Sequence, residues 1–455
     1  MEMINGMLSG KEIDLASKCI ETARRLGADR VRVTLSKSLM ELFGTLNGEL
    51  DKVNHCLDRS MSVSLFVDGR FGTFSTNRLE EEGLGSFLEK SISTVRMLAP
   101  DPCRALPSPD RKAAGAVSGT ELDLMDPDYA AVSSDQRLKM AMDASIFNGN
   151  KDGRLISEEG EYSDSIYDSL VIDSEGLFCR HCETSFEYGV EMTIIDGGGN
   201  RYSGYWWDSA PRLRNLGIAS CGATALERAL NQIGPQKIGS GKYTMVVDNE
   251  NSSRLVAPLL SALSGYSIQQ KNSFLTDTLG NRVFPEWLDI LDRPHQKGRS
   301  GSRLFDSEGV ATKEHSIIEK GVVKEYFINT YMSNKMGMAP TVEDATRPVI
   351  PASISPGLAN PGSLDQEGIL RLAGDGILVT GFNGGNSNSA TGNFSFGVDG
   401  FRFKDGKILH PVREMLITGN LLTLWNNLLA AGDDPRSCKS RQIPTLAFKD
   451  VDFSA

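Results

Sequence analysis

The chain has 455 residues, 40% of them hydrophobic, and a formal net charge of −11 at pH 7. This length exceeds what one hydrophobic core usually serves, so two or three domains are expected. An acidic balance without clusters of Lys and Arg argues against a protein that grips nucleic acid through its phosphates. No run approaches the roughly 18 apolar residues of a membrane span, and residues 1–30 lack the apolar core of a secretory signal.

Seven cysteines are spread along the chain without the spacing of a disulfide framework. An odd number of this kind is typical of a protein that stays in a reducing compartment. Together with the missing signal and membrane segments, it predicts a cytoplasmic protein.

The first half of the chain alternates between helical and strand patterns. Ser9 is placed to cap a helix whose apolar face repeats every three or four residues and which ends at Gly27. Asp68-Gly69 joins two alternating apolar runs in the manner of a hairpin turn. After the first helix, the predicted elements are strands at 30–34, 60–67 and 71–75 and helices at 79–98 and 135–147.

Residues 155–207 continue with strands separated by turn-rich segments. Pro211 then opens a predicted helix that extends to Ile233, because proline suits a first helical turn, where its missing N–H would have no partner. The proline and glycines of 234–241 mark a linker. We therefore predict two domains, 1–235 and 236–455.

The second half begins with a strand at 243–247 and a helix at 254–263, which Pro258 must either kink or begin. Hairpin patterns dominate from there to Phe403. Two further helices are predicted at 329–336 and 363–372.

Residues 376–434 carry the clearest pattern in the chain. Three apolar or alternating runs are separated by clusters of Gly, Asn and Asp, as antiparallel strands joined by tight turns are. Asp405-Gly406 supplies the positive φ values of a two-residue turn, and a helix is predicted at 420–429, stopped by Gly432. The whole chain thus predicts an α+β fold: an N-terminal antiparallel sheet with packed helices, and a C-terminal barrel-like, mostly antiparallel β domain with helices.

Three segments of the second half also carry a family resemblance. The first is 376–434, with Ala-Thr-Gly-Asn-Phe-Ser at its centre; the second combines 271–280 with 305–310; the third, looser match is 329–337. Together they resemble the C-terminal signature of the TldD/PmbA (TldE) family, some of whose members have been called modulators of DNA gyrase. The resemblance implies a protein related to metallopeptidases.

The metal-bearing branch of that family, TldD, resembles a metallopeptidase with His-Glu-x-x-x-His on a helix, a spacing that holds one ion between two imidazoles. The equivalent helix here, at 253–265, contains neither His nor Glu. Cys438 lies where the zinc branch supplies a cysteine ligand, but one thiolate cannot form a zinc site. The chain therefore resembles the PmbA/TldE branch, and we expect no metal, cofactor or catalytic residue of its own.

Cys179 and Cys182 form a Cys-x-x-Cys pair, which suggests metal or redox chemistry. The pair lies within an alternating run, however, and residues three apart on a strand point to opposite faces. We interpret both cysteines as structural.

The loop at 383–395 is the predicted substrate-binding site. Small residues allow a ligand to approach closely, and Asn, Ser and Thr offer hydrogen bonds to a peptide main chain. The alternative is a plain hairpin turn on a barrel-like sheet. The candidate residues are Asn383, Thr391, Gly392, Asn393 and Ser395.

The resemblance implies a non-zinc subunit that acts with a TldD-like zinc subunit on unfolded peptides. One alternative is a stand-alone homodimeric peptidase with an unconventional site. Another, a DNA gyrase-associated regulator, is disfavoured by the acidic balance of the chain.

Overall fold

The computed structural model describes residues 6–455, which divide into two compact units. The first unit contains the chain up to Leu230 together with His295–Thr312 and Asn329–Val342. The second contains Asn231–Pro294, Lys313–Ile328 and Glu343–Ala455. The chain therefore enters the second unit after Leu230 and returns to the first unit twice.

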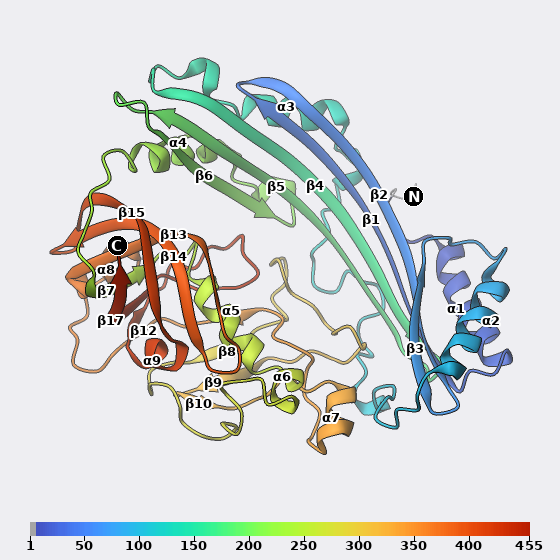
Figure 1. Ribbon diagram of the computed structural model, residues 1–455. Helices are drawn as coiled ribbons and strands as arrows, with labels where there is room; N and C mark the ends of the chain where they lie inside the picture. The colour runs from blue at the N-terminus through green and yellow to red at the C-terminus, as the bar shows by residue number, and fades with distance from the viewer. Residues whose placement is uncertain (1–5) are drawn as a thin grey trace. The chain divides into compact units, whose positions relative to one another are not determined.

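The first unit is built on one long antiparallel sheet (Figure 1). Its order is β3-β2-β1-β4-β5-β6, so the two hairpins that flank the centre are joined by pairing of β1 with β4. The strands are β1 (Arg30–Leu46), β2 (Glu49–Val67), β3 (Arg70–Thr76), β4 (Leu155–Asp173), β5 (Phe178–Ile195) and β6 (Arg201–Ala210). This sheet confirms the antiparallel N-terminal architecture predicted from the sequence.

Helices cover the sheet in two groups, each with its own apolar cluster. In the first group, α1 (Gly10–Arg25) packs on β1, and α2 (Leu84–Met97) packs on β2 and β3. In the second group, α3 (Ser134–Asp143) packs on β1 and β4, and α4 (Cys221–Leu230) packs on β5 and β6. Ser9 caps α1 as predicted, because its side chain accepts the Glu12 N–H while Glu12 accepts the Ser9 N–H.

The central strands are much longer than the alternating runs that predicted them. β1 continues from Thr34 to Leu46, and a turn at Asn47 and Gly48, with φ values of 53° and 77°, reverses the chain into β2. The sequence pattern is weak there because every residue of β2 from 49 to 59 is exposed, so no apolar alternation marks that half of the strand.

Two predicted helices of this unit begin later than expected. The predicted helix at 79–98 starts only at Leu84. The helix predicted from Pro211 is wrong in its first part, since α4 begins at Cys221 after two short 3-10 turns. The carboxylates of Asp126 and Asp208 accept the N–H groups of Leu213 and Gly217 and so compete with helical hydrogen bonding.

The core of the second unit is a closed barrel of five strands, which confirms the predicted barrel-like domain. The barrel runs β17-β15-β14-β13-β7 and closes by pairing of β7 with β17; β13 and β7 are parallel, and the other neighbours are antiparallel. Its strands are β7 (Gly241–Val247), β13 (Asp375–Ser387), β14 (Asn393–Lys404), β15 (Lys407–Asn420) and β17 (Leu446–Ser454).

Shorter elements surround the barrel. The strands β16 (Leu428–Ala431) and β12 (Ser353–Ile354) extend the sheet from β17. A separate four-stranded sheet is formed by β8 (Ile290–Asp292), β9 (His315–Glu319), β10 (Val322–Val323) and β11 (Pro348–Val349). The helices of the second unit are α5 (Ser253–Ala262), α6 (Gly265–Gln269), α8 (Gln366–Ala373) and α9 (Leu421–Asn426), while α7 (Thr330–Met336) belongs to the first unit.

One further prediction needs correction in the second unit. The helix expected at 420–429 is limited to α9, because Leu428 already pairs with Phe448 in a strand. Of the two alternatives for Pro258, a place in the first helical turn is excluded, because Pro258 lies in the interior of α5. None of the helices formed by the described residues is both long enough and apolar enough to cross a membrane.

Candidate functional site: a hairpin turn on the barrel and an acidic pocket on the sheet

The predicted loop at 383–395 is mostly strand. β13 continues to Ser387 and β14 begins at Asn393, so only residues 388–392 lie outside the ladder. Asn388 closes this turn, since its N–H donates to the Asn393 carbonyl at 2.7 Å and its carbonyl accepts the Gly392 N–H at 2.8 Å. The Asn388 side chain also accepts the N–H groups of Ala390 and Thr391. The turn is therefore ordered by its own hydrogen bonds.

Three of the predicted residues meet at this turn around Asn420. The Asn420 side-chain amide donates to the Thr391 carbonyl at 2.8 Å and to Asn393 Oδ1 at 2.9 Å. Gly392 is buried with a φ of +76°, and a Cβ at that position would lie 3.1 Å from the Phe274 ring. The close approach at Gly392 is thus made by an aromatic side chain of the same unit, and Thr391 and Asn393 remain exposed beside it.

The other two predicted residues lie farther along the hairpin. The amide of Asn383 on β13 donates to Asp399 Oδ2 at 2.8 Å, and Ser395 on β14 pairs with Asn386. The structure therefore brings Thr391, Gly392 and Asn393 together and leaves Asn383 and Ser395 outside that group.

A small cavity of about 100 Å³ adjoins the turn through Phe394 and Asn420. Lys242 and Asp452 form an ion pair of 2.9 Å on its wall. The cavity offers apolar contact, hydrogen bonds and both signs of charge, which suits one small side chain of a bound peptide.

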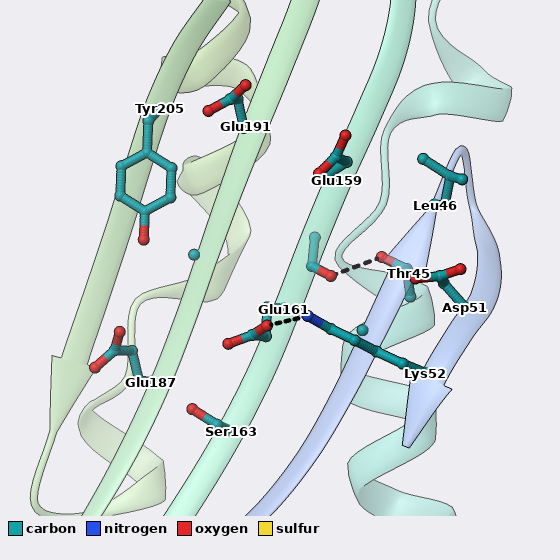
Figure 2. A pocket seen from close by; sticks show the side chains of 13 residues that line it. Thr45, Leu46, Asp51, Lys52, Glu159, Glu161, Ser163, Glu187, Glu191 and Tyr205 are labelled. Atoms are coloured by element: carbon teal, nitrogen blue, oxygen red, sulfur yellow. Dashed lines mark hydrogen bonds and ion pairs between the residues drawn. The ribbon is translucent and has the colours of Figure 1, made fainter. Parts of the chain in front are cut away.

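A second, larger pocket of about 420 Å³, which the sequence analysis does not predict, lies on the sheet of the first unit. Figure 2 shows its side chains in front of the strands with helical segments behind. The acidic pairs Glu159 and Glu161 on β4 and Glu187 and Glu191 on β5 could have indicated it, because residues two or four apart share one face of a strand. It is lined by Gly44, Thr45, Leu46, Asp51, Lys52, Glu159, Gly160, Glu161, Ser163, Glu187, Gly189, Glu191 and Tyr205.

Two glycines create the space on the floor of this pocket. Gly44 lies between Lys52 and Glu161 in the ladder, and a Cβ on it would come within 2.6 Å of the Lys52 side chain. Lys52 Nζ can therefore cross the sheet and reach Glu161 Oε2 at 2.8 Å (Figure 2). Gly189 has the same role for Tyr205, whose hydroxyl would lie 2.4 Å from a Cβ at that position.

The pocket has an excess of negative charge, because Asp51, Glu159, Glu161, Glu187 and Glu191 face the single cation Lys52. Burial raises the pKa of Glu187, and the nearby charge of Glu161 raises it further. Such a surface can accept hydrogen bonds and cationic groups from a ligand.

Cys179 and Cys182 lie in separate buried environments. Cys179 Sγ donates to the Ala113 carbonyl at 3.3 Å, while Cys182 Sγ lies beside Gly119, 2.7 Å from the position that a Cβ there would take. Burial raises the pKa of Cys179 to about 11 and that of Cys182 to about 12, so both thiols stay protonated at neutral pH.

The helix after β7 does not offer ligands for zinc. α5 buries Leu255, Val256, Leu259 and Ala262. Cys438 is buried, and the residues beside it, Arg436 and Lys439, contact Glu250. Across residues 6–455, no three His, Cys, Asp or Glu side chains gather in a way that could hold a metal ion. The residues present therefore do not fit the zinc of a metallopeptidase, and no step of a reaction is assigned to a metal in this chain.

Comparison with known proteins places this fold in a family. Residues 127–233 match the model of the PmbA/TldA metallopeptidase central domain, and residues 240–455 match that of the PmbA/TldA metallopeptidase C-terminal domain. The metalloprotease PmbA of Escherichia coli O157:H7 is 28% identical over 425 residues, covering 92% of this chain and 92% of that protein.

Solved structures extend the likeness over the whole chain. A Bacteroides thetaiotaomicron protein described as a candidate modulator of DNA gyrase is 39% identical, with a TM-score of 0.92 over 99% of this chain and 100% of that one. TldE of Thermococcus kodakarensis shares the fold at 18% identity, with a TM-score of 0.80 over 97% of this chain and 100% of that one. The residues matched by the two domain models and the 39% identity to a relative of full length show that this chain belongs to the PmbA/TldD family.

Proposed function

We propose that this chain is the non-zinc, TldE-like subunit of a two-subunit cytoplasmic metallopeptidase that acts on unfolded peptides. A TldD-like partner would supply the zinc and the hydrolytic chemistry. The observation that carries the proposal is the aliphatic face of α5, in a chain whose relatives are named metalloproteases. The resemblance implies that the zinc branch holds its metal ligands on the helix that corresponds to α5, and here that helix buries Leu255, Val256 and Leu259.

The part of this chain would be to bind and orient substrate. Thr391 and Asn393 are exposed at a turn held by Asn420, so their polar groups are presented by a rigid element. A site on an ordered element positions a peptide better than a flexible one, because less conformational freedom is lost on binding. The adjoining 100 Å³ cavity provides room for one side chain of that peptide.

The test is reconstitution from separately purified subunits. We expect the chain alone to bind less than a stoichiometric amount of zinc and to leave unfolded casein intact, whereas mixing it with a zinc-bearing TldD-like subunit should yield chelator-sensitive cleavage. Metal analysis and casein digestion are the measurements. One tightly held zinc per chain, with proteolysis by the chain alone, would support the alternative of a stand-alone homodimeric peptidase.

Asn393→Ala tests whether the turn contacts peptide. We expect the fold and the assembly to stay intact, since Asn393 is exposed, and the KM of the assembled enzyme to rise several-fold with little change in kcat. That pattern is expected when an interaction made equally with substrate and transition state is removed. Peptide cleavage measured against substrate concentration gives both constants.

The matched control is Asn386→Ala, because Asn386 is an exposed asparagine on the same hairpin, outside the turn. It should leave KM unchanged. Wild-type kinetics from an intact Asn393→Ala complex would mean that the turn only connects two strands.

A role as a regulator associated with DNA gyrase rests on the name given to the Bacteroides relative. The net charge of −11 opposes direct contact with DNA, because phosphate contacts need clustered Lys and Arg. We therefore rank this role below the peptidase subunit.

A further inference from the structure

One wall of the small cavity beside the hairpin turn is a row of polar side chains that crosses three strands of the barrel. Thr418 of β15 lies opposite Asp452 of β17, and Asp452 lies opposite Lys242 of β7. Residues directly opposite each other share one face of a sheet. The ion pair of 2.9 Å between Lys242 and Asp452 therefore belongs to the same row as Thr418, and all three residues line the cavity.

A bulge in β17 adds a second carboxylate to this cavity. The register between β17 and β7 shifts between Phe448 and Val451, and Asp450, within that shift, has a φ of +54°. Asp450 lines the cavity and is exposed. In the part of the chain that the structure describes, it forms no ion pair with a Lys or Arg side chain. Because Asp452 is already paired with Lys242, the carboxylate of Asp450 leaves the cavity with an excess of one negative charge.

The volume of the cavity limits which cation can neutralise that charge. The volume of about 100 Å³ corresponds to roughly three water molecules of the liquid, which is too little for an extended Lys or Arg side chain. The α-ammonium group of a peptide is more compact, because it is attached directly to Cα and, in Ala or Ser, is followed by a short side chain. It offers three N–H donors, as the ammonium group of Lys does. The hydroxyls of Thr418 and Thr423 and the amide of Asn427 supply acceptors on the walls.

We propose that this cavity binds the free N-terminus of a peptide substrate, with the α-ammonium group at Asp450 and the small side chain of the first residue inside. The inference rests on the proposed function and adds which end of the peptide this chain recognises. An interior segment of a peptide has a neutral main chain and gains nothing from the excess charge. A C-terminal carboxylate would meet like charge at Asp450, while Lys242 is already engaged by Asp452.

The hairpin turn lies where the next residues of such a peptide would pass. Asn420 lines the cavity and also binds Thr391 and Asn393 through its side-chain amide. Ser395 of β14 lies opposite Thr418 and extends the polar row by one strand. Binding of the first residue in the cavity would therefore bring the following main-chain groups to the exposed polar side chains of the turn.

The first test compares two peptides that differ only at the N-terminus. A hexapeptide that begins with Ala and has a fluorescent label at its C-terminus is prepared with a free and with an acetylated α-amino group. Fluorescence anisotropy then measures the binding of each to the full chain at pH 7. We expect the free form to bind with a Kd about fivefold lower, the upper size of one solvent-exposed charge pair.

Asp450→Asn should remove this preference. The substitution replaces the carboxylate by an amide of the same shape, and Asn tolerates the positive φ of this position. Both peptides should bind the variant with the Kd that wild type has for the acetylated one. Asp405→Asn is the matched control, because Asp405 is also exposed, has a φ of +51° in a turn of the same barrel and lies outside the cavity. It changes the net charge equally and should keep the preference.

The preference should also depend on pH, because an α-amino group loses its positive charge around a pKa of about 7.7–8.0. The Kd of the free peptide should therefore rise between pH 7 and pH 9 towards that of the acetylated peptide. The Kd of the acetylated peptide should stay constant over the same range. Anisotropy titrations at several pH values measure both.

Equal Kd values for the two peptides at pH 7, or tighter binding of the acetylated one, would overturn the proposal. So would a preference that Asp450→Asn leaves unchanged or that Asp405→Asn also abolishes, since the cavity would then not be its source. Absence of binding by the free peptide at about 1 mM, the range of very weak complexes, would also overturn it. None of these results requires cleavage, so they are separable from a failure of the reconstituted peptidase.

Discussion

Asp164→Ala is expected to destabilise the first unit by about 3–5 kcal/mol, the usual cost of leaving one partner of a buried ion pair without the other. Arg137 of α3 binds this carboxylate with Nε at 2.6 Å and Nη2 at 3.0 Å, and both side chains are buried. The Tyr162 hydroxyl adds a third hydrogen bond at 2.8 Å. Burial raises the pKa of Tyr162, and so does the charge of Asp164, so this tyrosine remains a donor.

Urea unfolding followed by circular dichroism measures this loss. A matched control is Asp143→Ala, which removes the exposed partner of Lys139 on the same helix and should cost about 0.3–0.5 kcal/mol. Equal losses of unfolding free energy from the two variants would show that the Arg137–Asp164 pair stabilises the protein no more than an exposed ion pair does. Replacing both partners, by Arg137→Met with Asp164→Leu, should recover much of the stability because no unpaired charge remains.

Trp425→Ala is expected to destabilise the barrel of the second unit by about 3–5 kcal/mol, as truncations of fully buried aromatic residues do. Trp425 of α9 is 0% exposed and meets the Phe448 ring edge to face at 5.4 Å between centroids. Phe448 lies on β17, which closes the barrel against β7. The space left by the missing indole would therefore lie beside β17, the strand that closes the barrel.

Trp425→Phe serves as the matched variant. It keeps an aromatic ring and removes an indole N–H that has no hydrogen-bond partner, so its cost should be far smaller than that of alanine. Thermal unfolding compares the two. A Trp425→Ala protein with the Tm of wild type would mean that the side chain does not support the barrel.

The sequence predicted correctly those features that depend on residues close together in the chain. Ser9 and Glu12 form the predicted helix cap, and the hairpin turns at Asp68-Gly69 and Asp405-Gly406 have the expected positive φ values. These features depend on hydrogen bonds and backbone preferences within a few residues, so the local sequence is sufficient to predict them.

The candidate sites depended more on distant residues. Thr391, Gly392 and Asn393 were predicted from composition, but the contacts that Asn420 and Phe274 add to the turn's own hydrogen bonds come from distant parts of the chain. The acidic pocket unites residues of β1, β2, β4, β5 and β6, and its floor exists because Gly44 and Gly189 leave room for the side chains of Lys52 and Tyr205. No local pattern specifies which strands become neighbours.

Periodicity, turn residues and motifs were enough to predict the α+β class, the antiparallel sheet, the barrel-like second half and the family of this protein, because they are local properties of the chain. The ends of the strands and the segments that cover them depend instead on contacts between distant residues. Leu428 became a strand residue because Phe448 offered a ladder, and α4 began late because Asp126 and Asp208 captured N–H groups that a helix would have used. Pairing between distant segments outweighs local preference at such positions, since burial and hydrogen bonding there stabilise the chain more than propensity does.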